Sequence, residues 1–186
     1  MLNRKKPLYL TLELNAKMQP MHRHDIEDII AEALDAAQCG ETDGGGSFMN
    51  ENGEIRFCDI EIKLSENTTE NIDVLLKVIG DIKVPKGSFL KGEDIEIPVG
   101  ILEGLGLYLN GTDLPDETYI NSDVNHVVDE CKRLLGEAGE LYSWWEGSAE
   151  TALYFYGASF NEMRDRLASF LAEYPLCQKC RVVQIA

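Results

Sequence analysis

The stretch VNHVVDECKRLLGEAGELYSWWEGSAETALYFYGASFNEMRDRLASFLAEYP, residues 124–175, decides the fold class of this chain. It begins and ends with segments whose apolar residues recur every three to four positions, the spacing of one face of an α-helix. Between these helices lie two aromatic-rich segments that favour strands, with a turn near Gly147. A capping box formed by Ser159 and Glu162 marks the start of the last helix, and Pro175 marks its end. The stretch therefore predicts helix, strand, strand, helix.

The first half of the chain has the same order of elements. Helical spacing recurs in residues 24–37 and 71–80. The Asn52-Gly53 pair is typical of a tight hairpin and separates two strand-like segments. The remaining strands are predicted by short runs of apolar residues at 8–14, 84–90, 104–111 and 180–186.

Both halves therefore predict strand, helix, strand, strand, helix, strand. This is the order of a ferredoxin-like βαββαβ unit, an antiparallel sheet with two helices on one face. We expect an α+β protein of two tandem ferredoxin-like units, residues 1–93 and 94–186, with an additional hairpin around Lys91-Gly92. A single mixed α+β domain is the alternative.

The charge of the chain is strongly negative and unevenly distributed. The formal net charge is −16, and the 70 residues from Asp94 to Met163 hold fourteen carboxylates but only two basic residues, Lys132 and Arg133. Such a field repels nucleic acids and anionic membranes and attracts basic proteins. We therefore expect a basic protein partner and no nucleic-acid or membrane partner.

The chain is expected to be a cytoplasmic protein. No apolar run reaches the roughly 18 residues of a membrane-spanning helix, and the apolar segment after the basic N-terminus is too short for a signal peptide. The cysteines are odd in number, which favours reduced thiols over a disulfide framework. The five are Cys39, Cys58, Cys131, Cys177 and Cys180.

The two aromatic strands predict one core face and one open face. Side chains alternate along a strand, so Tyr142 and Trp144 are expected on the face opposite Trp145. With an even-numbered turn, Trp144 shares the core face with Leu153 and Phe155. The open face then holds Trp145, Tyr154 and Tyr156. These rings either pack against the other half of the chain or a second copy of it, as in a homo-oligomer, or they anchor a different partner.

Neither the closely spaced cysteines nor the histidines predict a cofactor or metal site. Cys177 and Cys180 form a lone C-x-x-C without the second ligand pair that zinc needs. His22 and His24 precede Asp25, which is expected to cap the first helix, and His126 is expected to pair with Glu130 four residues later. These cysteines and histidines are interpreted as structural residues.

Two further motifs lack the context of a catalytic site. The segment GETDGGGS, residues 40–47, leaves a helix instead of entering one and carries carboxylates, so it predicts a flexible loop and no phosphate cradle. Ser148 lacks the second glycine of a nucleophile elbow and lies in the predicted hairpin turn. We expect no catalytic residue in either motif.

The leading functional prediction is a non-enzymatic interaction protein. An immunity or inhibitor protein that neutralises a basic toxin or nuclease is its concrete form, because carboxylates would steer the encounter and aromatic rings would hold the complex. The predicted partner-binding residues are Trp145, Tyr154, Tyr156, Asp113, Asp116 and Glu117.

Two other classes remain open. One is a small-molecule-binding or regulatory domain with its ligand between the two units, near residues 40–47. The other is an enzyme, which would require a pocket that gathers His22, His24 and several carboxylates.

Overall fold

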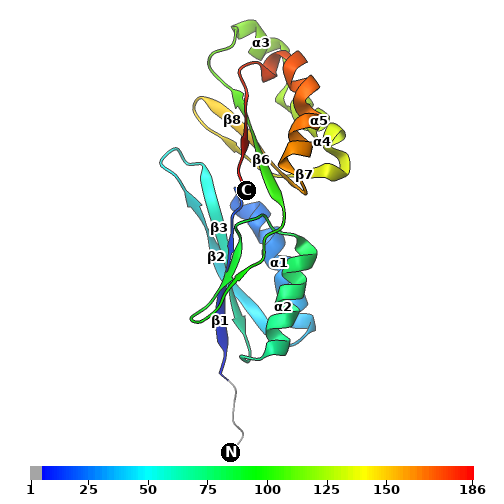
Figure 1. Ribbon diagram of the computed structural model, residues 1–186. Coiled ribbons are helices and arrows are strands. Elements are labelled where there is room, and N and C mark those ends of the chain that lie inside the picture. The colour runs from blue at the N-terminus through cyan, green and yellow to red at the C-terminus, as the bar shows by residue number, and fades with distance from the viewer. Residues whose placement is uncertain (1–5) are drawn as a thin grey trace, which may run out of the picture. The chain divides into compact units, whose positions relative to one another are not determined.

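The computed structural model describes residues 6–186, which form two compact units (Figure 1). The first unit comprises the described chain up to Met49 together with Ile55–Ile101. The second comprises Asn50–Glu54 together with Leu102–Ala186.

The first unit is a five-stranded antiparallel sheet with two helices, α1 and α2, on one face (Figure 1). Its elements in chain order are β1 (Leu8–Leu14), α1 (Pro20–Ala36), β2 (Gly40–Met49), β3 (Ile55–Leu64), α2 (Thr69–Ile82), β4 (Phe89–Lys91) and β5 (Glu96–Pro98). The strand order is β2-β3-β1-β4-β5. The first four strands have the order of a ferredoxin-like unit, and β5 pairs with β4 as the additional hairpin.

The second unit repeats this arrangement with a four-stranded antiparallel sheet. Its elements are β6 (Glu103–Asn110), α3 (Asp116–Asn121), α4 (Val124–Leu135), β7 (Gly139–Glu146), β8 (Glu150–Gly157), α5 (Phe160–Glu173) and β9 (Arg181–Gln184). The order β7-β8-β6-β9 is again ferredoxin-like. The fold is therefore α+β, with two tandem ferredoxin-like units.

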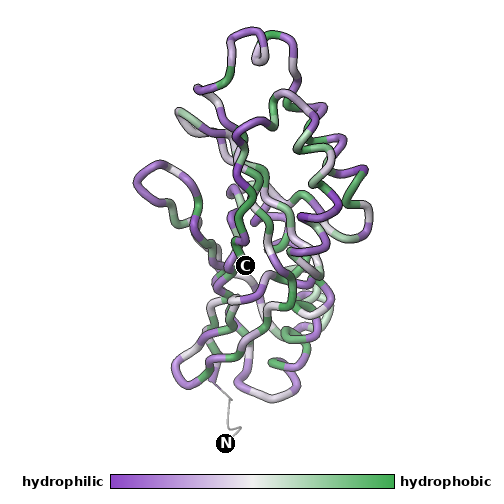
Figure 2. Tube along the Cα trace, turned by 45° about the horizontal axis from the view of Figure 1, so that its top comes forward, coloured by the Kyte–Doolittle hydropathy of each residue, from purple (hydrophilic) through white to green (hydrophobic). Residues whose placement is uncertain are grey.

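Hydrophobic and more polar side chains alternate along the strands of the first unit, so the hydrophobic ones gather on one face and form its core. In β1, Leu10, Leu12 and Leu14 are buried, whereas Tyr9 is 63% exposed on the opposite face. Figure 2 shows the same alternation of hydrophobic and hydrophilic residues along the strands, with mostly hydrophilic turns. The helices cover the hydrophobic face because their own apolar stripes lie against it.

The central strands of the second unit are buried on both faces. On the helix side, Leu107, Leu153 and Phe155 pack against Val127 and Leu167 of the helices. The opposite face of β8 carries tyrosines that are also buried. This double burial explains why residues 151–157 are almost continuously apolar or aromatic.

The helix boundaries follow from local signals. Ser159 caps α5 by accepting a hydrogen bond from the Glu162 amide (3.3 Å), as predicted. Helix α1 begins earlier than predicted, at Pro20, because proline suits the first helical turn. Asp25 is therefore not its cap. Among the described residues, no helix is long and apolar enough to span a bilayer.

Candidate partner-binding groove

The register of the β7–β8 hairpin fixes which aromatic side chains share a face. Trp144 pairs with Leu153, and Trp145 pairs with Ala152, one residue before Leu153. This confirms that Trp144 lies on the helix face of the sheet and Trp145 on the other face. The strand is irregular between Leu141 and Ser143, and the extra residue, Tyr142, contacts the Tyr156 ring at a centroid distance of 4.9 Å. The expected side of Tyr142 is therefore wrong, because a bulge reverses the alternation.

Tyr154 and Tyr156 lie on the predicted face but are buried. Each is only 1% exposed. The Glu54 carboxylate, which belongs to the same unit, accepts hydrogen bonds from the hydroxyls of Tyr154 (2.7 Å) and Tyr108 (2.6 Å). Burial, followed by these hydrogen bonds to the carboxylate, raises the pKa of both tyrosines. The expectation that Tyr154 and Tyr156 are exposed anchors is wrong, since both rings are buried.

A groove lies between helix α4 and the edge strand β7. Its helical wall is formed by Val124, Val128 and Lys132, and its floor and other wall by Leu141 and Trp144. The groove encloses about 430 Å³. We call it the α4–β7 groove.

The groove exposes apolar surface because the apolar stripe of α4 is slightly wider than the part of the helix that packs against the sheet. Val127 and Leu135 are fully buried beneath the helix. Val124, at the margin of the stripe, remains 38% exposed, and Trp144 across the groove remains 40% exposed. An indole and a valine facing one groove supply the kind of surface on which partner proteins are anchored.

The sequence prediction missed the groove residues. Trp144 was placed in the core, and its face is indeed the core face, but β7 is the outer strand of the sheet. At an edge, a large ring on the core face can remain partly uncovered. The position of a strand within a sheet is not encoded in its own alternation, so no local signal distinguishes Trp144 from a buried residue.

A carboxylate lies at one end of the groove. Glu146, which lines the groove, ends β7 and is exposed. The amide of Gly111 donates to the carbonyl of Ala149 (2.8 Å) in the β7–β8 turn. This hydrogen bond places the loop that carries Asp113 at the same end of the sheet as Glu146.

The three predicted acidic partner residues are all exposed. Asp116 and Glu117 form the first turn of α3, and the Asp113 carboxylate accepts from the Asn110 side-chain amide (3.3 Å). Together with Glu146 they give this end of the unit a negative potential. From the sequence alone, this charge could be assigned only to residues 94–163 and not to one end of the folded unit.

The five cysteines form no disulfide with one another, and four of them are buried. Burial raises the pKa of the Cys58, Cys131 and Cys177 thiols to about 12, so thiolate is scarce near neutral pH. Cys180 is only partly buried, and its amide donates to the Cys177 carbonyl (3.1 Å) across a turn. No group of three or more candidate metal ligands is present in residues 6–186.

Two of the three histidines lie on α1 instead of preceding it. His22 and His24 are both in the first turns of α1, next to Arg23, which is buried and pairs with Glu27 (2.8 Å). The predicted position of the HRHD motif before the helix is therefore wrong.

His126 packs against the ring of Tyr174 at a centroid distance of 5.0 Å. Glu130, its predicted partner, instead forms an ion pair with Arg133 (2.7 Å). The guanidinium lowers the pKa of the Glu130 carboxyl.

The glycine-rich segment at residues 40–47 is a strand, β2, and not a flexible loop. It pairs with β3 through a register shift between Thr42 and Gly45. A side chain at Gly45 would collide with the carbonyl of Asp59 on β3, so the glycine permits close approach of the two strands. The ladder hydrogen bonds with β3 outweigh the low strand propensity of the glycines.

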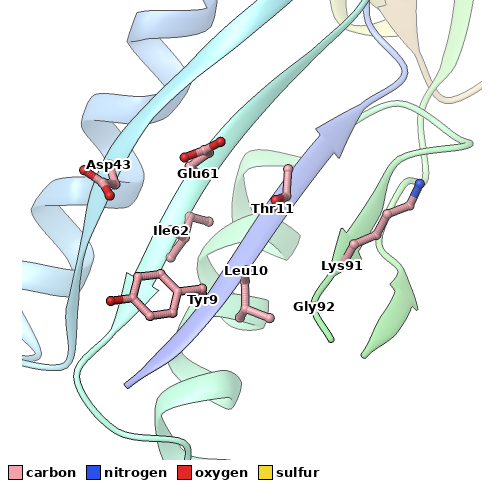
Figure 3. A pocket seen from close by; sticks show the side chains of 8 residues that line it. All are labelled: Tyr9, Leu10, Thr11, Asp43, Glu61, Ile62, Lys91 and Gly92. Atoms are coloured by element: carbon pink, nitrogen blue, oxygen red, sulfur yellow. The ribbon is translucent and has the colours of Figure 1, made fainter. Parts of the chain in front are cut away.

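A second, shallower hollow lies on the first unit, on the sheet face without helices (Figure 3). It encloses about 350 Å³ and is bordered by Tyr9, Asp43, Glu61 and Lys91. Lys91 forms an ion pair with Glu13 (3.0 Å). Neither this hollow nor the α4–β7 groove is lined by a histidine.

Comparisons with known proteins leave the function open. No family model matches the chain, and no curated protein matches it. An unknown protein from Galdieria sulphuraria matches over 97% of this chain and 100% of its own, with 9% identity and a TM-score of 0.35. The ligand-free regulatory subunit of aspartate kinase from Thermus thermophilus matches over 88% and 90%, with 12% identity and a TM-score of 0.30.

The first two RRM domains of the yeast poly(U) binding protein Pub1 match over 96% of this chain and 99% of theirs, with 9% identity and a TM-score of 0.25. Likenesses this distant assign no function to the chain.

Proposed function

We propose that this protein is a non-enzymatic interaction protein that binds a basic protein through its second unit. An immunity or inhibitor protein directed at a basic toxin or nuclease is the most concrete form of this function. The observation that carries the proposal is the exposed apolar groove, with Trp144 at its edge and the Glu146 carboxylate in its lining. Electrostatic attraction would accelerate the encounter, and burial of the indole would hold the complex.

The surface charge of the second unit supports a basic partner. Asp113, Asp116, Glu117 and Glu146 are exposed, and among the described residues none of the four forms an ion pair. The Lys179 ammonium donates to the backbone carbonyl of Asp113 (2.8 Å) and offsets part of this charge. The remaining negative potential is one that a cationic surface can neutralise. Trp145 is half-buried on the opposite face and is kept as a secondary contact only.

Neutralising the acidic end is expected to slow association with a basic partner. In a panel of purified basic proteins that includes nucleases, the partner should bind the triple variant D113N/D116N/E117Q roughly ten-fold more slowly at low salt, because steering depends on the summed charge. Surface plasmon resonance at several salt concentrations measures this rate. The difference between wild type and variant should shrink as salt screens the field.

The matched control carries the same charge change elsewhere. The variant D25N/D28N/E32Q removes three exposed carboxylates from α1 of the first unit. It should associate almost as fast as the wild type. If both triple variants bind every member of the panel as the wild type does, and salt has no effect, the proposed function is wrong.

A ligand-binding regulatory role is the second candidate. The hollow in Figure 3 favours it, because Asp43 of the glycine-rich strand, Glu61 and Tyr9 border a concave surface. A specific metabolite that raises the melting temperature of the protein, and fails to do so for the Asp43→Asn variant, would favour this role.

A further inference from the structure

Three of the five cysteines lie in one part of the second unit. Cys131 of α4 and Cys177 belong to the hydrophobic core of this unit, and Cys180 packs against the same core. Cys131 is fully buried and Cys177 is 2% exposed, whereas Cys180 is only partly buried. Of these three thiols, Cys180 is therefore the one that a small molecule in solution reaches first.

Cys177 and Cys180 are the first and last residues of a tight turn. The Cys180 amide donates a hydrogen bond to the Cys177 carbonyl (3.1 Å). Between them, Gln178 has φ −62° and ψ 139°, and Lys179 has φ 58°. These angles are close to those of a type II turn, whose third residue has a positive φ. The Lys179 ammonium donates to the Asp113 carbonyl (2.8 Å) and so anchors the turn in this conformation.

The turn brings the two cysteines within the range of a disulfide. The Cα atoms at the ends of a β-turn are less than about 7 Å apart, and those of a disulfide are about 4.4 to 6.8 Å apart. Both side chains reach the same core. Burial raises the pKa of Cys177 and the charge of a Cys180 thiolate raises it further, as expected of neighbouring thiols. A bond between the two sulfur atoms is therefore compatible with the backbone of this turn.

Cys131 is the competing partner for either thiol. It lies on α4, so a disulfide from it would join the helix to the turn. No backbone hydrogen bond between Cys131 and the turn is found in residues 6–186, whereas the Cys177–Cys180 pair is closed by one. The geometry therefore favours the pair within the turn.

We propose that Cys177 and Cys180 form a reversible redox site, which low-molecular-weight disulfides oxidise to an intramolecular disulfide. This inference is independent of the proposed function. It adds a modification site on the turn that precedes β9.

The reaction is two successive thiol–disulfide exchanges. The Cys180 thiolate attacks one sulfur of the oxidant RSSR, the S–S bond breaks, and RS⁻ leaves and takes up the proton that Cys180 released. The Cys177 thiolate then attacks the Cys180 sulfur of the mixed disulfide, and the second RS⁻ leaves and takes up the Cys177 proton. The protein loses two electrons and two protons, and the oxidant becomes two molecules of RSH.

Equilibration of the full-length protein with mixtures of oxidised and reduced glutathione tests this proposal. Remaining thiols are alkylated in denaturant, and the protein is digested with trypsin for mass spectrometry. Trypsin cuts after Lys179, between the two cysteines, so the disulfide is expected to link residues 167–179 to residues 180–181. Because the folded turn holds the pair together, the equilibrium constant for this disulfide should be roughly ten-fold higher in the native protein than in urea.

Two alanine variants check the role of each thiol. Cys131→Ala removes the competing thiol and should leave the linkage and its equilibrium constant unchanged within about two-fold. Cys177→Ala removes the second attacking thiol, so glutathione should remain attached to Cys180, an adduct that the wild type does not accumulate.

Three results would overturn the proposal, and the first two come from the wild type alone. They are Cys177 and Cys180 both alkylated at every glutathione ratio, or a disulfide that includes Cys131. The third is an equal equilibrium constant in native and urea-unfolded protein, which would mean that the fold does not favour the bond.

Discussion

Replacing Phe155 with alanine is expected to destabilise the second unit by about 3 to 5 kcal/mol, the usual cost of deleting a buried phenylalanine ring. The ring is fully buried and lies opposite Leu105 of β6 and Leu141 of β7 in the helix-side core. Chemical denaturation followed by tryptophan fluorescence measures the effect. Trp144 and Trp145 are the only two tryptophans and both lie in the second unit, so the signal reports on this unit alone.

The Phe155→Leu variant is the control for this measurement. Leucine retains most of the apolar contact, so the expected loss is below about 1.5 kcal/mol. A loss of less than 1 kcal/mol for Phe155→Ala would mean that the ring is not in the core. The register of the β7–β8 hairpin, and with it the position of Trp144 on the groove face, would then be incorrect.

Alkaline pH is expected to destabilise the second unit steeply. Tyr108 and Tyr154 have raised pKa values because of burial and their hydrogen bonds to Glu54, and burial also raises the pKa of Tyr142. Above pH 10 the hydroxyls of Tyr108 and Tyr154 ionise in the unfolded chain but stay protonated in the folded one, so stability that is present below pH 10 is lost as pH rises. The expected loss is about 1.4 kcal/mol per pH unit for each of these two tyrosines, and Tyr142 adds to it in the same direction.

Unfolding free energies measured between pH 9 and pH 11.5 test this dependence. The buried thiols contribute in the same direction from about pH 9, since their folded pKa values of about 12 also exceed the unfolded value. The double variant Tyr108→Phe/Tyr154→Phe therefore isolates the tyrosines and should show a clearly shallower decline than the wild type. Equal slopes in the two proteins would contradict the burial of these hydroxyls.

The sequence predicted the fold well because the signals that define it are local. The helical spacing of α4 and α5, the Ser159 cap and the Asn52-Gly53 turn each act within a few residues of the chain. Repetition of the same order in both halves then leaves few topologies, and the ferredoxin-like one is the observed one.

The binding surface was predicted less well because it depends on relations between distant segments. The bulge at Tyr142 reverses the alternation that was used to assign its face, and burial of Tyr154 depends on Glu54, which is 100 residues away in the chain. The groove exists because β7 is an edge strand beside α4. Only the acidic character of this region was visible in the sequence.

Hydrogen exchange of the complex tests the central claim most directly. With the basic partner identified from the panel bound to the full-length protein, mass spectrometry compares amide exchange in the free and bound states. We predict that binding slows exchange in residues 124–135 and 139–146, which form the two walls of the α4–β7 groove. Slower exchange confined to the first unit, with both walls unchanged, would contradict the account.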